Sequence, residues 1–243
     1  MTPLLEVIVC NVEEARAAAA AGATRLEIIS HYEVGGLTPD LDVVRDILAA
    51  VPVPARVMLR DEETFFLADV PIAEKKIAEK KIERLCDLAR SFTELPIDGF
   101  VLGFLRGDSI DHSTVARILA SAPRTRATFH RAFEELPDPL LAIAELKRHP
   151  QIDCILTSGG AAPWAEKLER FEQWERASRP EIGILVGGGT DAEAVELFTR
   201  RTSIRAFHLG RAVRDGGRLD GPVRADLVRG FSDRIFSASA PDR

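Results

Sequence analysis

The stretch Arg126-Ala-Thr-Phe-His-Arg-Ala-Phe-Glu134 decides how the fold is interpreted. Residues 127–130 are typical of a short buried strand, and the Pro-Asp-Pro sequence that follows opens a helix. A strand alternates its side chains, so Thr128 and His130 are expected on one face and Arg131 on the other. A strand that ends in His-Arg just before a helix is typical of the place where an α/β barrel holds its chemistry.

Strand and helix patterns alternate along the whole chain. Strands are expected at 4–9, 25–29, 55–60, 99–105, 127–130, 153–157, 182–186 and 204–209. Helices are expected at 12–21, 40–50, 71–91, 113–121, 140–148, 165–177, 192–200 and within 220–236. Strict alternation implies a parallel sheet, and eight units in 243 residues fit one α/β domain, a (β/α)₈ barrel of TIM type.

The barrel is expected to span residues 1–236, with a flexible tail at 237–243. An open Rossmann-type sheet is the alternative architecture. It is disfavoured because Asn11-Val12-Glu13 follows the first strand, where a GxGxxG loop would stand.

Composition limits the partners and the compartment. The formal net charge is −6, and a net acidic chain without a basic run argues against nucleic acid or a membrane surface as the main partner. The sequence contains no run of 18 apolar residues and no basic leader, so neither a membrane span nor a signal peptide is expected. Cys10, Cys86 and Cys154 lie far apart, which fits free thiols in a reducing cytoplasm.

Polar side chains lie within or at the ends of several predicted strands. The candidate catalytic residues are Glu6, Glu27, Arg60, His130 and His208, with Thr157 at the end of a further strand. Side chains at the carboxyl ends of barrel strands converge on one mouth, and charged residues are rarely buried unless paired. Carboxylates beside imidazoles suit proton transfer or a hard or borderline metal, and they also suit a purely structural network.

Glycines follow the last two strands. Gly187, Gly188 and Gly189 precede a helix that Asp191 caps, and the eighth strand ends in Gly210-Arg211. Glycine allows backbone N–H groups to approach an anion, and a helix N-terminus adds its dipole. Because barrels often hold a phosphate between the loops after strands seven and eight, we expect a small anionic ligand there, although tight turns alone would also explain the glycines.

Several strings resemble the CutC family, the copper homeostasis proteins. They run in order from residue 4 to about 215: Leu-Glu-Val at 5–7, Gly-Ala-Thr-Arg-Leu-Glu at 22–27, Gly-Gly-Leu-Thr-Pro at 35–39, Thr-Phe-His-Arg-Ala-Phe at 128–133, Ile-Leu-Thr-Ser-Gly at 155–159 and Phe-His at 207–208. The resemblance implies a TIM-type barrel, a cytoplasmic location, homo-oligomers and a role in handling Cu(I).

The chain departs from the family pattern in two places. Family members usually follow the third strand with Arg-Pro-Arg-Gly-Gly-Asp-Phe, whereas here Arg60 is followed by an acidic loop at 61–65, which should bind anions less well. The family's proposed copper cysteines fall at Ile8 and Ile29.

The soft ligands that Cu(I) prefers are therefore scarce in this chain. Cys10 is the one thiol expected near the mouth and a weak candidate for a metal ligand. Cys86 should pack outside the barrel, and Cys154 should face the helices if Thr157 faces inward. We expect no tight Cu(I) binding by the monomer.

Two functions are therefore predicted. One is a CutC-like copper homeostasis protein, in which copper as a ligand is implied by the resemblance alone. The other is a TIM-barrel enzyme that acts by acid–base chemistry on a small anionic or phosphorylated metabolite, and a purely structural or partner-binding barrel also remains open.

Overall fold

The computed structural model describes residues 3–68 and 70–237. Eight parallel strands close into a barrel in the order β1-β10-β9-β8-β7-β4-β3-β2, which confirms the predicted α/β barrel. These strands are β1 (Leu4–Val9), β2 (Arg25–Ile28), β3 (Ala55–Met58), β4 (Gly99–Leu102), β7 (Arg126–Phe129), β8 (Ile152–Thr157), β9 (Gly183–Val186) and β10 (Ala206–Leu209).

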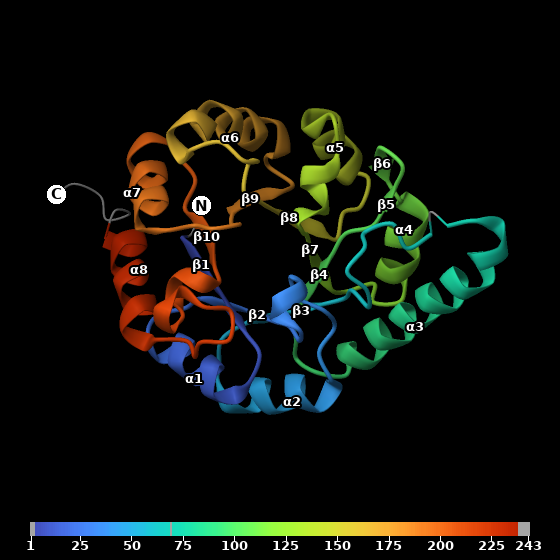
Figure 1. The fold of residues 1–243 in the computed structure, drawn as a ribbon, viewed down its shortest axis with the longest axis horizontal. Coiled ribbons are helices and arrows are strands. Elements are labelled where there is room, and N and C mark those ends of the chain that lie inside the picture. Colours follow the sequence, from blue (N-terminus) through green and yellow to red (C-terminus); the bar gives the residue numbers. More distant parts are fainter. Residues whose placement is uncertain (1–2, 69, 238–243) are drawn as a thin grey trace.

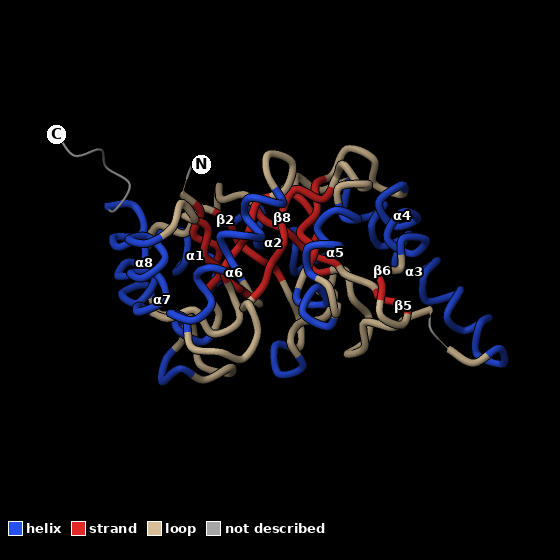
Figure 2. The backbone as a smooth tube through the Cα atoms, turned by 90° about the horizontal axis from the view of Figure 1, so that it is seen from above, coloured by secondary structure: helices blue, strands red, loops and turns tan. Residues whose placement is uncertain are grey.

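The long helices form a ring around the strands (Figure 1). They are α1 (Val12–Ala20), α2 (Leu41–Ala50), α3 (Lys75–Thr93), α4 (His112–Ala120), α5 (Pro139–Leu146), α6 (Trp164–Ser178), α7 (Ala192–Arg201) and α8 (Ala225–Ser237). The last helix packs between α7 and α1 and closes the ring. Seen from the perpendicular direction, the strands run through the middle and the loops gather at the two ends (Figure 2).

Side-chain alternation separates an apolar shell from a polar interior. Outward residues such as Val7, Val57 and Phe129 are fully buried in the large apolar cluster between strands and helices. Inward residues on the same strands include Glu6 and Arg56, both almost completely buried. Burying apolar surface drives the folding of such a shell, whereas the inward charges need partners inside the barrel.

Side-chain caps begin several of the helices. Asp191 accepts a hydrogen bond from the Ala194 N–H at 2.8 Å, as the sequence predicted. Asp138 does the same for α5, where it accepts from the Leu141 N–H at 3.0 Å. Because such caps satisfy N–H groups that no helix carbonyl can reach, they fix where the helices start.

Short elements interrupt the simple alternation. A two-stranded hairpin of β5 (Leu105–Arg106) and β6 (Ser109–Ile110) lies between β4 and α4, so Leu105 is not part of the fourth barrel strand. Within the described residues, 3-10 turns lie in the connections: η1 (Tyr32–Val34), η2 (Ile72–Glu74), η3 (Arg131–Glu135), η4 (Arg211–Val213) and η5 (Asp215–Gly217). The tail predicted at 237–243 lies outside the described residues, except that Ser237 is the last residue of α8.

Candidate functional site

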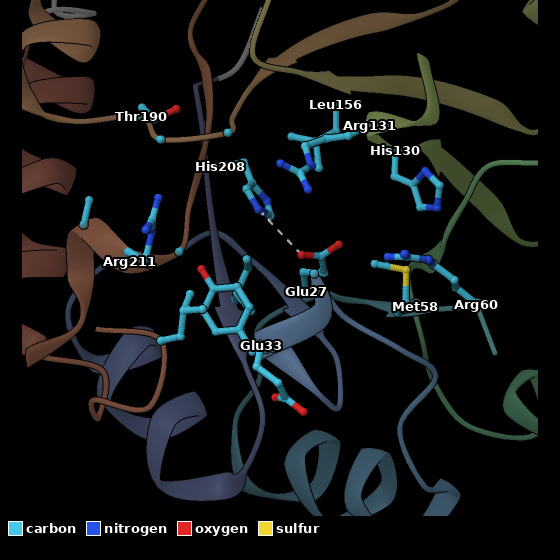
Figure 3. Close-up of a pocket in the computed structure, with 18 of the residues that line it drawn as sticks. Glu27, Glu33, Met58, Arg60, His130, Arg131, Leu156, Thr190, His208 and Arg211 are labelled. Carbon is cyan, nitrogen blue, oxygen red and sulfur yellow. Dashed lines mark ion pairs between the residues drawn. The ribbon is translucent and has the colours of Figure 1, made fainter. Parts of the chain in front are cut away.

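A cavity of about 510 Å³ opens at the carboxyl ends of the barrel strands. It lies where strands β2, β3, β7, β9 and β10 pass into their loops, which is where α/β barrels carry their binding sites. Figure 3 shows the side chains around it, with the Glu27 carboxylate between His208 and Arg60. A cavity of this volume falls in the range of small-molecule sites.

Four of the five predicted catalytic residues line this cavity, namely Glu27, Arg60, His130 and His208. Glu6 is the exception, because it lies one layer deeper in the barrel. It pairs in register with His208 on one side and Arg25 on the other. The sequence pattern therefore placed its side chain inside the barrel correctly but one layer too close to the mouth.

Glu6 anchors the buried charges beneath the cavity. Its carboxylate is fully buried, forms an ion pair with Arg25 and accepts a 2.7 Å hydrogen bond from Nδ1 of His208. Burial alone would raise the pKa of the Glu6 carboxyl, but Arg25 and His208 outweigh burial and lower that pKa to about 2. Glu6 is therefore ionised at neutral pH and holds the imidazole above it in place.

His208 and Glu27 form a coupled pair at the floor of the cavity. Nε2 of His208 lies 3.6 Å from Oε2 of Glu27, the contact drawn in Figure 3. Burial raises the pKa of the Glu27 carboxyl to about 7, with His208 opposing the rise and Glu6 adding to it. Burial alone would lower the pKa of His208, but Glu27 and Glu6 raise it. The pair therefore holds a proton near neutral pH, as acid–base chemistry requires.

His130 lines the cavity, and its two ring nitrogens differ in their partners. Nδ1 accepts a 3.2 Å hydrogen bond from the backbone N–H of Ala132, which assigns the proton to Nε2. Burial, followed by the charges of Arg60 and Arg131, lowers the pKa of His130 to about 3. The imidazole is therefore neutral at physiological pH, and its Nε2–H finds no acceptor among the described residues.

Arg60 is a buried cation that forms no ion pair with a carboxylate in the described part of the chain, although the charge of Glu63 opposes the lowering of its pKa by burial and by Arg131. Its Nη atoms donate to the carbonyl oxygens of Gly36 and Glu63, and its guanidinium lies 4.8 Å from the ring centre of Phe65. Its Nε is buried and unpartnered within residues 3–68 and 70–237. An anion bound in the adjoining cavity would offset the cost of burying this positive charge.

The glycine loops border the cavity on the other side. Gly188 and Gly189 line it with φ of +71° and +101°, a backbone conformation that disfavours other residues. Gly210 and Arg211 line it as well. Gly187 is not among the residues that line the cavity. A side chain at this position would meet Leu156 and His208, so the glycine allows close packing beneath the loop.

The comparison with known proteins identifies the family. A model of the CutC family matches residues 3–213. The chain belongs to the CutC family. A CutC family protein of Vibrio cholerae serotype O1 is 32% identical over 211 residues, which cover 84% of this chain and 78% of that protein.

Two further members support the assignment. A human relative named copper homeostasis protein cutC homolog is 30% identical over 217 residues, covering 88% of this chain and 76% of that protein. The solved structure of CutC from Streptococcus agalactiae has a TM-score of 0.71 to this chain at 25% identity, with 85% of this chain and 98% of that chain covered. These matches agree with the resemblance drawn from the sequence strings.

Some cavity residues of this CutC family member were missed by the sequence pattern. Arg131 was expected on the outer face, but β7 ends at Phe129 and η3 begins at Arg131, so the side chain turns into the cavity. Tyr32 and Met58 also line it. The Thr-Phe-His-Arg string was a usable signal for Arg131, since its two polar side chains adjoin in sequence at a strand end.

The face assignment of β8 was wrong. Leu156 lines the cavity, and Thr157 points the other way, where its hydroxyl donates to Glu134 at 3.0 Å. Cys154 consequently faces the interior, with its sulfur 3.8 Å from Nη2 of Arg25. The cause is a bulge in β8: Ala127 of β7 pairs with Ile152, but the next residue, Thr128, pairs with Cys154. The extra residue reverses the faces of the rest of β8, and the alternation within a single strand cannot reveal it.

The three thiols of the chain are separate. Cys10 lies near the mouth and packs against the small cluster that contains Ile8, Ile29 and Met58, whereas Cys86 packs in the shell outside the barrel. Burial raises the pKa of the Cys10 thiol to about 11, and Glu14 adds to the rise. The thiol is therefore protonated at neutral pH, which makes it a poor ligand and nucleophile.

The acidic loop at 61–65 does not place its carboxylates in the cavity. Asp61 and Glu62 form ion pairs with Arg84 and Lys81 of α3, and only Phe65 of this loop lines the cavity. Two of the three acidic charges of the loop are therefore neutralised by α3, whereas the charge of Glu63 acts on Arg60 at the cavity.

Among residues 3–68 and 70–237, no helix combines the length and the apolar character that a membrane crossing requires.

Proposed function

We propose that this chain acts in copper homeostasis, the role in the name of its human relative. The observation that carries the proposal is the CutC family match over residues 3–213. Action in the cytoplasm and assembly into homo-oligomers belong to the same proposal. The free thiols of Cys10, Cys86 and Cys154 support the first, and the family resemblance supports the second.

The donor atoms of the chain do not fit a tight Cu(I) site. Cu(I) prefers thiolate or thioether sulfur, and Cys10 stands near the mouth without a second thiol beside it. Within the described residues, no three His, Cys, Asp or Glu side chains form a group that could hold a metal ion. Glu6 and Glu27 do flank His208, but they contact opposite ring nitrogens and cannot chelate a common ion. We propose that the chain serves copper homeostasis without carrying Cu(I) tightly.

Deleting the gene in its host is expected to lower copper tolerance, and both the wild-type chain and Cys10→Ser are expected to restore it. The thiol is not needed because it has no partner for a two-coordinate site. Growth across a copper series measures this outcome, and an anaerobic competition of the reduced protein against a strong Cu(I) chelator measures binding. Stoichiometric copper retention that disappears in Cys10→Ser would contradict the second half of the proposal, and unchanged tolerance after deletion would contradict the first.

A second function is favoured by a specific observation, the unpartnered Nε of the Arg60 guanidinium in the cavity that Glu27 and His130 also line. Three polar atoms of these residues are buried and unpartnered in the described chain: Oε1 of Glu27, Nε of Arg60 and Nε2 of His130. Leaving such atoms unmatched costs about 1–3 kcal/mol each, more when charged, so a ligand that pairs with them binds favourably. We propose that the cavity belongs to an enzyme that acts by acid–base chemistry on a small anionic metabolite.

Inorganic phosphate is the simplest probe of this second function. Binding to the folded state alone stabilises a protein by about 2.7 kcal/mol at a ligand concentration 100 times Kd, which corresponds to a rise in Tm of about 5–10 °C for a chain of this size. Thermal melting in phosphate and in sodium chloride of equal ionic strength tests this. Equal melting temperatures in the two salts would contradict anion binding.

A further inference from the structure

We propose that the cavity catalyses proton transfer at the carbon next to a carbonyl group, in a small substrate that carries a phosphate or carboxylate. Glu27 is the base, and His130 is the hydrogen-bond donor to the carbonyl oxygen. The inference rests on the small-anion enzyme proposed for this cavity, and it assigns the reaction and the roles of its residues.

Glu27 has the placement of a base. Its side chain is only 2% exposed, comes from a barrel strand and is fixed through Oε2 by His208, whereas Oε1 has no partner in the described chain. One carboxylate oxygen therefore faces the imidazole, and the other is buried without a partner, so a substrate that reached it would supply the missing hydrogen bond. Because the pKa of the Glu27 carboxyl is raised to about 7, this group can both take and return a proton near neutral pH. His208 acts on Glu27 as a positioning residue, because Glu6 fixes its other nitrogen.

His130 has the placement of the donor. The Ala132 N–H occupies Nδ1, so the buried and unpartnered Nε2–H is the group that would pair with a ligand bound against the ring. Phe65 packs on the ring, 5.0 Å between centroids, and keeps the imidazole from turning away. A neutral imidazole donates to the oxygen that gains charge as a carbon acid ionises, and a carboxylate base beside a neutral imidazole is an established arrangement for this chemistry.

The anionic group of the substrate has two sets of partners. Arg60 and Arg131 lie on the His130 side of the cavity, and Arg211 lies across it (Figure 3). Gly188 and Gly189 also line the cavity. A carboxylate next to the carbonyl fits the guanidinium groups, because it must stay close to His130. A phosphate several bonds away from the carbonyl fits the glycine loop, where backbone N–H groups can approach it and the Asp191 carboxylate already caps α7. Free inorganic phosphate, which has no carbonyl to place at His130, is expected at Arg60. Both sources share one chemistry, an anionic carbonyl compound.

The reaction balances without a further reactant. The C–H bond breaks, its proton goes to Glu27, and its electron pair forms the carbon–carbon double bond of an enolate. The carbonyl electron pair moves onto the oxygen, where the His130 Nε2–H stabilises it. Return of the proton to the same carbon restores the substrate, and exchange of the Glu27 proton with water in between labels that carbon.

Hydrogen exchange in D₂O, followed by proton NMR, tests the proposal directly. One arm uses dihydroxyacetone phosphate and ribulose 5-phosphate, and the other uses pyruvate and 2-oxobutyrate. In one of the two arms, we expect deuterium to enter at the carbon next to the carbonyl faster than it does in buffer alone. Exchange in the first arm would identify phosphate as the anionic group of the substrate, and exchange in the second would identify carboxylate. Glu27→Gln is expected to lower the catalysed rate by about 10²- to 10⁴-fold.

A second variant and a control keep the test independent of folding. His130→Asn retains an acceptor for the Ala132 N–H but lacks the Nε2–H, and it should lower the rate by about 10²- to 10³-fold. Glu83→Gln changes an exposed glutamate of α3 and should leave the rate unchanged. Thermal melting in phosphate is measured on every variant.

The outcomes separate the reaction from the binding. Exchange at the buffer rate in both arms, with stabilisation by phosphate retained, would overturn proton transfer and leave the anion site. Exchange that is equally fast in Glu27→Gln and His130→Asn would overturn the assigned roles. Loss of both exchange and phosphate stabilisation in the wild-type chain would overturn the underlying enzyme proposal as well.

Discussion

Replacing Glu6 by glutamine is expected to lower the free energy of unfolding by about 3–5 kcal/mol. Glu6 is fully buried and is the carboxylate partner of both Arg25 and the His208 Nδ1. Glutamine has nearly the same size, so the loss comes from two buried cations that keep their desolvation cost without a compensating charge. Urea denaturation, followed by circular dichroism, measures the change.

The pH dependence of the same variant tests the cause. The pKa of Glu6 is lowered from 4.5 to about 2 in the folded protein, so the stability it contributes is present above about pH 4.5 and is lost as pH falls toward 2. The wild-type chain should lose its advantage over Glu6→Gln across that range. Glu83→Gln, on the surface of α3, provides a control for removing a carboxylate. A loss below about 1 kcal/mol at neutral pH would show that the buried pairs are not mutually dependent.

Much of the fold could be predicted because barrel strands repeat a simple physical pattern. In the 127–130 segment, alternation placed Thr128 and His130 inside, and the structure agrees: Thr128 contacts the interior Arg56, and His130 lines the cavity. The same reasoning placed Glu27 inside. A charged side chain in a short apolar strand is a strong signal, because the chain must provide a partner for it.

The remaining features depend on relations between strands that one strand does not encode. The stagger of the barrel decides that Glu6 lies below the cavity and Glu27 at its floor, although each follows a leucine in an apolar strand. The bulge in β8 decides that Leu156 faces inward, and the end of β7 at Phe129 decides the direction of Arg131. The tautomer of His130 depends on the Ala132 N–H, which reaches Nδ1 only because η3 starts there.

Arg60→Met is expected to separate anion binding from stability. The variant should bind phosphate about 10- to 100-fold more weakly, because a hydrogen bond to a charged group contributes about 1.5–3 kcal/mol. Its free energy of unfolding without ligand should stay within about 1 kcal/mol of the wild-type value. The side chain loses two hydrogen bonds to carbonyls and the contact with Phe65, but it no longer buries a cation that lacks a carboxylate partner in the described chain.

Isothermal titration with phosphate and urea denaturation measure the two quantities on the same protein. Arg84→Met is the matched control, because Arg84 is an exposed arginine of α3 that pairs with Asp61 outside the cavity. It should change neither quantity by more than a small amount. If Arg60→Met instead destabilised the fold by the 3–5 kcal/mol expected of Glu6→Gln, the guanidinium would be a structural brace. If its affinity for phosphate matched the wild-type value, the anion would bind at the glycine loops and not at Arg60, because only that cation was removed.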